Sequence, residues 1–75
     1  MRDQEIWSER FKTKKGKTFF FDVKENENGK FVKITESIYI GDNRHKRTFI
    51  TVSEDCIGEF ISVSQKVQEI MSSRT

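Results

Sequence analysis

The sequence lacks proline altogether and contains a single cysteine, Cys56. One cysteine cannot form an internal disulfide or a cysteine-based metal site, so the chain must be stable without crosslinks, which fits a reducing cytoplasm. Without proline or a low-complexity stretch, the sequence offers no candidate linker. We therefore expect residues 1–75 to form one folding unit.

Long apolar segments are also absent. No run approaches the roughly 20 residues that a membrane-spanning helix needs. The opening segment, MRDQEIWSERF, includes acidic side chains and no apolar signal-peptide core. We expect a soluble protein that is not exported, has no membrane partner and is located in the cytoplasm.

Charge is abundant but nearly balanced. Fourteen Lys and Arg residues oppose twelve Asp and Glu residues, which gives a net charge of +2. Hydrophobic residues make up only 33% of the chain, yet they include seven phenylalanines, one tryptophan and one tyrosine, which indicates a folded chain built around aromatic residues. A chain of this length buries only roughly 60–65% of its unfolded surface, so a partner subunit would stabilise it.

Alternating apolar and polar residues predict four β-strands. The turns between them are marked by KKGK at 14–17, by Asn28-Gly29 and by GDN at 41–43. Asn28-Gly29 is the strongest hairpin signal because both residues tolerate a positive φ. Short turns between consecutive strands predict an antiparallel meander. The expected strands span residues 5–12, 18–25, 30–40 and 45–52.

One helix is expected after the fourth strand. Ser53 can cap its first turn, and Glu54 and Asp55 suit the positive end of the helix dipole. The segment that follows is apolar on more than one face, which is more than packing on a small sheet requires. The predicted fold is therefore α+β, in the order β-β-β-β-α, with the helix laid across the sheet and a further apolar surface left to bury. The apolar helix positions are Ile57, Phe60, Ile61, Val63, Val67, Ile70 and Met71.

Side-chain alternation divides the expected sheet into two faces, and the triple phenylalanine at 19–21 sends its middle ring, Phe20, to the outer one. The inner face holds enough apolar residues for a core beneath the helix, namely Phe19, Phe21, Val23, Val32, Ile34, Ile50 and Val52. The outer face is aromatic and basic together, with Arg10, Lys12, Phe20, Lys24, Phe31, Lys33, Arg47 and Phe49.

The aromatic and basic face has two open interpretations. Exposed rings among cations suit single-stranded nucleic acid, because rings stack on bases and cations neutralise phosphates. An exposed apolar patch can equally be a docking surface for another protein. Asp22, on the same face, weakens a pure phosphate-binding interpretation. The basic runs near 14–17 and 44–47 also fit charged strand edges that discourage aggregation.

Residues that could carry catalysis are sparse. His45 stands alone in a basic turn, and Cys56 is expected to be a small buried or half-buried residue whose acidic neighbours disfavour a reactive thiolate. The sequence contains no glycine loop for phosphates, no paired histidine ligands and no nucleophile with a base partner. We therefore expect no enzyme activity, no metal and no cofactor.

One segment, TFFFDVKENENGKFVKITES at 18–37, follows a recognisable pattern. The pattern is an aromatic run, Asp-Val-Lys-x-Asn, a short turn with glycine, a basic residue, Phe, an aliphatic residue, Lys, Ile and a Glu close behind. The matching residues are Phe19, Phe20, Phe21, Asp22, Val23, Lys24, Asn26, Gly29, Lys30, Phe31, Val32, Lys33, Ile34 and Glu36. The segment resembles the core of a PUR repeat from the PUR-alpha-like family of purine-rich-element-binding proteins, and weaker similarity covers nearly the whole chain.

The resemblance implies that residues 1–75 form one PUR repeat, which is half of a PUR domain. It is similar to the short bacterial members of the family, which complete the domain as a homodimer. A twofold interface would bury the same helix surface from both chains, in agreement with the broadly apolar helix. The expected interface residues are Ile57, Phe60, Ile61, Val67 and Ile70.

The resemblance also implies binding of single-stranded DNA or RNA, with a preference for G-rich purine sequences, and association with the nucleoid would fit such a role. The family's contacts match Lys24 and Asn26, together with a polar stretch before the aromatic run that corresponds to Gly16 and Lys17. Two positions depart from the family pattern and remove contacts: Gly16 stands where the family has a hydroxyl residue, and Asn28 stands where it often has a basic one. A dimeric scaffold that docks another protein through the same face is the alternative. The predicted nucleic-acid site is Lys17, Phe20, Lys24, Asn26, Asn28, Lys30, Phe31 and Lys33.

Overall fold

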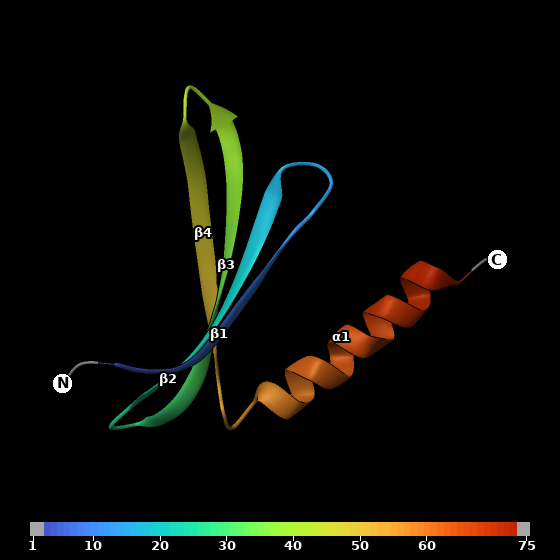
Figure 1. Ribbon diagram of the computed structural model, residues 1–75. Coiled ribbons are helices and arrows are strands. Elements are labelled where there is room, and N and C mark those ends of the chain that lie inside the picture. The colour runs from blue at the N-terminus through green and yellow to red at the C-terminus, as the bar shows by residue number, and fades with distance from the viewer. Residues whose placement is uncertain (1–2, 74–75) are drawn as a thin grey trace.

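The computed structural model describes residues 3–73 and has the predicted order of elements. Four strands form one antiparallel sheet in the sequential order β1-β2-β3-β4, and one helix follows (Figure 1). The α+β fold and the β-β-β-β-α order expected from the sequence are thereby confirmed. The elements are β1 (Gln4–Lys12), β2 (Lys17–Asn26), β3 (Gly29–Gly41), β4 (Arg44–Ser53) and α1 (Ile57–Ser72).

Tight turns join the strands where the sequence predicts them. The β3–β4 turn places Asp42 and Asn43 at φ values of 53° and 58°, the backbone that suits a two-residue hairpin in a right-handed sheet. The β2–β3 turn closes with Asn26 paired to Gly29, whose φ is 121°. A side chain at Gly29 would also meet the Glu54 carboxylate, but that carboxylate is the end of a flexible side chain, so the backbone conformation is what favours glycine there.

The strand register confirms the two predicted faces of the sheet, because directly opposed residues point to the same side. Bulges occur between Glu5 and Trp7 and between Tyr39 and Gly41, outside the central rows. The apolar face consists of Trp7, Phe11, Phe19, Phe21, Val23, Val32, Ile34, Ile50 and Val52. The opposite side, called the mixed face below, includes Ser8, Arg10, Lys12, Thr18, Phe20, Asp22, Lys24, Asn26, Phe31, Lys33, Thr35, Ser37, Arg47, Phe49, Thr51 and Ser53.

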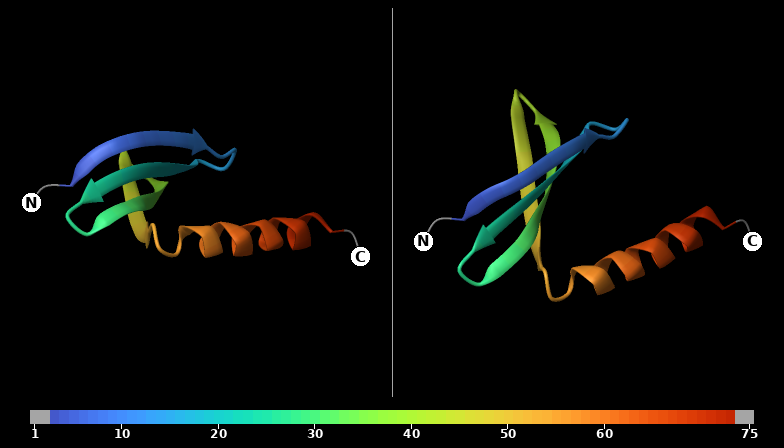
Figure 2. Two further views of the ribbon diagram at one scale, coloured as in Figure 1. Left: turned by 90° about the horizontal axis from the view of Figure 1, so that it is seen from below. Right: turned by 60° about the horizontal axis from the view of Figure 1, so that its bottom comes forward.

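The helix does not lie across the sheet, and that part of the prediction is wrong for the single chain. α1 leaves the end of β4 and runs away from the sheet at an angle (Figures 1 and 2). Between them an open cleft of about 800 Å³ is lined by apolar-face residues such as Phe19 and Ile50 and by Phe60, Ile61 and Val67 of the helix. No helix residue among those described is buried.

The helix also begins later than its sequence signals predict. Ser53 is the last residue of β4, and its hydroxyl donates a hydrogen bond to the Asp55 carboxylate instead of capping the helix. Strand pairing continues past it, since the Glu54 N–H donates to the Lys30 carbonyl at 3.0 Å. The helix is capped from Cys56, which makes no side-chain capping bond and is exposed, contrary to the expected burial.

A chain of this mass leaves unusually little of itself buried. Among the described residues, only Val52 and Ser37 are buried, with exposed fractions of 6% and 3%. The accessible surface is 6747 Å², whereas a compact monomer of 8.9 kDa would expose roughly 4,800 Å². The radius of gyration is 15.0 Å, against about 11 Å for a compact domain of this length. The chain therefore retains a large apolar surface that it cannot cover itself.

Candidate functional site

Three phenylalanine rings lie on the mixed face, and each has different neighbours. Phe20, on β2, is half-buried between two guanidinium groups. The Arg10 guanidinium carbon, from β1, lies 5.8 Å from the ring centroid, and that of Arg47, from β4, lies 5.6 Å from it. These distances are typical of cation–π contacts. The ring thus joins cations from opposite edges of the sheet.

Phe49 on β4 also carries a cation. The Lys33 ammonium of β3 lies 4.4 Å from its ring centroid, while 60% of Phe49 remains exposed. Lys33 belongs to the predicted site, and its direct partner on the neighbouring strand β2 is Asp22. The Asp22 carboxylate accepts a hydrogen bond from the Ser8 hydroxyl at 2.6 Å. This carboxylate is thus oriented by β1.

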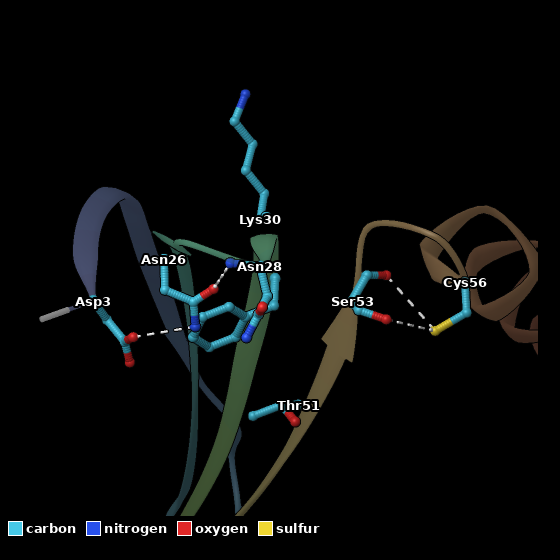
Figure 3. Close-up of a pocket in the computed structure, with 9 residues that line it drawn as sticks. Asp3, Asn26, Asn28, Lys30, Thr51, Ser53 and Cys56 are labelled. Atoms are coloured by element: carbon cyan, nitrogen blue, oxygen red, sulfur yellow. Dashed lines mark hydrogen bonds between the residues drawn. The ribbon is translucent and has the colours of Figure 1, made fainter. Parts of the chain in front are cut away.

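Phe31 lies in a different environment, at the end of the sheet near the β2–β3 turn. It lines an open pocket of about 520 Å³ together with Asn26, Asn28, Thr51 and Ser53 (Figure 3). No cation lies over its ring among residues 3–73. The other lining residues are Asp3, Gly29, Lys30 and Cys56. Phe31 therefore presents an aromatic surface to a cavity rimmed with polar groups.

Hydrogen bonds hold the amide side of this pocket in place. The Asn26 amide nitrogen donates to the Asp3 carboxylate at 3.4 Å, and its oxygen accepts from the Asn28 N–H at 2.9 Å. Figure 3 shows Asn26 and Asn28 side by side, with Ser53 and Cys56 across the pocket. The Cys56 thiol donates to the Ser53 carbonyl at 3.6 Å. Asn26 is thereby oriented before any ligand arrives.

The predicted site residues do not all come together. Phe20, Lys24, Phe31 and Lys33 share the mixed face, and Asn26 and Asn28 lie at the rim of the pocket. The register puts two further residues, Lys17 and Lys30, on the side of the apolar face. Lys17 lies apart from the group, whereas Lys30 still lines the edge of the Phe31 pocket.

Lys17 and Lys30 each have other contacts. The Lys17 ammonium lies 2.9 Å from the Glu36 carboxylate and 5.8 Å from the centroid of Phe19. This hydrogen bond from Lys17, with its positive charge, lowers the pKa of Glu36 below its ordinary value of 4.5. The Lys30 side chain points away from the pocket in Figure 3, while its N–H donates to Glu54 at 2.6 Å.

Several residues of the site were not predicted as such. Arg10 and Arg47 had been assigned to the outer face by alternation, but their meeting at Phe20 depends on how the sheet brings β1 and β4 toward one ring. Thr51 and Ser53 follow Phe49 at alternate positions, so the same alternation could have added them. No sequence signal placed Cys56 at the pocket.

Charge is separated along the strands. The end that carries the β1–β2 and β3–β4 turns, called the basic end below, also has Glu36 and Asp42 but is dominated by cations. These are Lys12, Lys14, Lys15, Lys17, Arg44, Lys46 and Arg47. The opposite end, near the β2–β3 turn, has Lys24 and Lys30 among six carboxylates. These are Asp3, Glu5, Glu25, Glu27, Glu54 and Asp55.

The described part of the chain contains no candidate metal centre. No group of three or more His, Cys, Asp or Glu residues among residues 3–73 could hold a metal ion. His45 packs edge-on against Tyr39, with ring centroids 5.4 Å apart. Over the same residues, no helix has the length and apolar character needed to cross a membrane.

Comparison with known protein families agrees with these features. Residues 3–73 match the family model described as PurA ssDNA and RNA-binding protein. The match covers all four strands and the helix. No curated protein matches the sequence.

Proposed function

Since the chain belongs to the PurA family of single-stranded DNA- and RNA-binding proteins, we propose that it acts as a homodimer that binds purine-rich single strands through the mixed face. The observation that carries this proposal is Phe31, a ring open to a pocket that is lined by amide and hydroxyl groups. The matched family is a nucleic-acid-binding family and not a known enzyme family.

The proposed mechanism uses the pocket for one base and the nearby lysines for phosphates. A base stacks on Phe31, which is worth about 1–3 kcal/mol for a base on an aromatic side chain. Asn26 and Asn28 hydrogen-bond to the base edge, where their amide N–H groups can donate to the N7 acceptor that both purines share. Lys24 and Lys33, which flank Phe31 on the mixed face, neutralise phosphates.

The homodimer is proposed from the surface that one chain leaves uncovered. Phe60, Ile61 and Ile70 are 39%, 49% and 74% exposed, and they belong to the interface predicted from the sequence together with Ile57 and Val67. The excess surface is roughly 1,900 Å² per chain, a size that fits the larger interfaces of obligate homodimers. In our proposal, the helix of each chain fills the open cleft of the other chain, as twofold symmetry requires.

Nucleic-acid binding is tested by fluorescence anisotropy with labelled poly-purine, poly-pyrimidine and duplex probes. The proposal predicts the tightest binding to the purine single strand and weaker binding for Lys24→Ala and Phe31→Ala. Glu69→Ala, on the exposed side of α1, is the matched surface control and should bind as the wild type does. Equal affinity for all three probes, or equal binding by all variants, would contradict the proposal.

The dimer is tested separately by light scattering over a range of protein concentrations. The proposal predicts a mass close to twice 8.9 kDa, and a monomer at high concentration would contradict it.

A second candidate is a dimeric scaffold that docks another protein through the mixed face. It is favoured by the 60% exposure of Phe49, which shares one row of the mixed face with Phe20, because an exposed apolar patch can be a surface for protein contacts. The two candidates separate on one result. The scaffold predicts no probe binding at micromolar protein, whereas our main proposal predicts binding that weakens with salt.

A further inference from the structure

We propose that Arg10, Phe20 and Arg47 form a phosphate-binding subsite at the basic end of the mixed face, in which Phe20 positions the two arginines and does not stack on a base. This inference rests on the proposed binding of single strands by the mixed face. It assigns Phe20 a role different from the stacking role that its outward direction suggests. The ligand group is the phosphodiester of the DNA or RNA backbone.

The geometry around Phe20 carries the first step. Arg10 is the direct neighbour of Phe20 across the β1–β2 pair, while Arg47 comes from the far edge strand. Both guanidinium carbons lie within 6 Å of the ring centroid. A guanidinium group held on an aromatic ring keeps its N–H donors free at its edge, and their fork geometry matches phosphate oxygens. The ring thereby presents two such donors together.

The charge balance carries the second step. Neither arginine takes part in an ion pair in the described part of the chain, where Lys17 and Glu36 are paired. The surrounding end of the sheet is rich in cations, whereas the Phe31 pocket lies at the end with six carboxylates. A polyanion is therefore attracted more strongly to the basic end, which includes Arg47 and lies next to Arg10. The base pocket and the strongest positive potential are separate.

The separation along β2 carries the third step. Phe20 and Lys24 are four residues apart on one strand, which corresponds to about 13 Å. A single strand that enters the Phe31 pocket beside Lys24 can continue along the mixed face to Arg10 and Arg47. Lys33 lies between the two regions, held over the Phe49 ring. The ligand would thus be held at both ends of the sheet.

The test measures the affinity for a purine-rich single strand at several salt concentrations. Each lost phosphate contact makes the plot of log affinity against log salt shallower by about 0.7, so Arg10→Gln with Arg47→Gln should reduce the slope by about 1.4. Lys66→Gln, which removes the same type of charge from the exposed surface of α1, should leave the slope unchanged. Circular dichroism checks that each variant is folded.

A second measurement separates positioning from stacking. Phe20→Leu should weaken binding about fivefold or more, the effect of one or two cation–π contacts, and Phe20→Tyr should restore it. The loss for Phe20→Leu should persist with an abasic oligonucleotide, which has phosphates but no bases. The loss for Phe31→Leu should disappear with that probe, because Phe31 is proposed to act on a base.

The outcomes are distinct. A wild-type protein that binds with a salt slope unaffected by the arginine variants would overturn this subsite and leave the proposed function standing. A Phe20→Leu loss that vanishes with the abasic probe would show that Phe20 stacks on a base and would overturn its positioning role. A wild-type protein that binds no single strand would overturn the proposed function and this inference with it.

Discussion

The two faces of the sheet use the same residue type, phenylalanine, in opposite ways. On the apolar face, the rings mainly meet other rings: the Phe11 centroid lies 5.4 Å from that of Phe19 and 6.1 Å from that of Phe21, and a cation, Lys17, reaches only the outer ring, Phe19, at 5.8 Å. On the mixed face, Phe20 and Phe49 meet cations. The same side chain thus serves a surface that needs protein to cover it and a surface suited to an anionic ligand. The alternation of side chains along each strand determines which residues surround a ring, and these neighbours determine which of the two surfaces the ring belongs to.

The largest expected effect comes from placing a charge in the apolar cleft. Ile61→Glu should abolish the proposed dimer at micromolar concentration, because burying an unpaired carboxylate costs several kcal/mol. Light scattering would detect the fall from dimer to monomer mass, and circular dichroism would detect any loss of secondary structure. Phe49→Glu, on the mixed face, is the matched control and should remain dimeric. Loss of the dimer in both variants, or in neither, would contradict the claim that the apolar face and not the mixed face forms the dimer interface.

Phe31→Ala should reduce nucleic-acid affinity without changing the dimer. The expected loss is about 1–3 kcal/mol, the value of one stacked base. Anisotropy titration measures it, and Phe49→Ala should have a smaller effect because the Lys33 ammonium occupies one face of that ring. A larger loss for Phe49→Ala than for Phe31→Ala would show that the pocket is not the main stacking site.

A pair of lysines on opposite faces gives a smaller effect. Lys24→Ala should make the salt dependence of binding shallower by about 0.7, the contribution of one phosphate contact to a single strand. Lys17→Ala should change it less, because the Lys17 ammonium is paired with Glu36 on the other side of the sheet. Equal changes for the two variants would support the role that family resemblance assigns to Lys17 and would mean that its pair with Glu36 opens on binding.

The smallest effect concerns Glu36 itself. Since the pKa of Glu36 is lowered in the folded chain, its contribution to stability is present above its ordinary value of 4.5 and is lost as the pH falls through the lowered value. Urea denaturation at pH 7 and near pH 3 should show a slightly smaller change of midpoint for Glu36→Gln than for the wild type. An identical change in both proteins would indicate that the pair with Lys17 contributes nothing measurable.

The sequence predicted the sheet well because its signals are local. Alternation and the turns at Asn28-Gly29 and 41–43 were sufficient to find four strands and assign both faces. The same parity separates Lys17 and Lys30 from Phe20, although the family pattern grouped them in one site.

The position of the helix could not be predicted in the same way. Ser53 does not cap the helix, because strand pairing continues to the hydrogen bond between Glu54 and Lys30. The helix therefore begins at Ile57. The segment between β4 and α1 sets the direction in which the helix leaves the sheet. That direction decides whether the apolar residues of α1 pack on their own sheet or remain available to a partner. The contact of Arg47 with Phe20 could not be predicted from the sequence either, because it joins residues of β2 and β4 across the intervening strand β3.

The central claim, that the mixed face binds purine-rich single strands, is tested most directly by one anisotropy experiment with a G-rich oligonucleotide at increasing salt. Our account predicts micromolar or tighter binding whose logarithm falls linearly with the logarithm of salt, and weaker binding to the duplex of the same sequence. Binding that is insensitive to salt, or equally tight to the duplex, would contradict it.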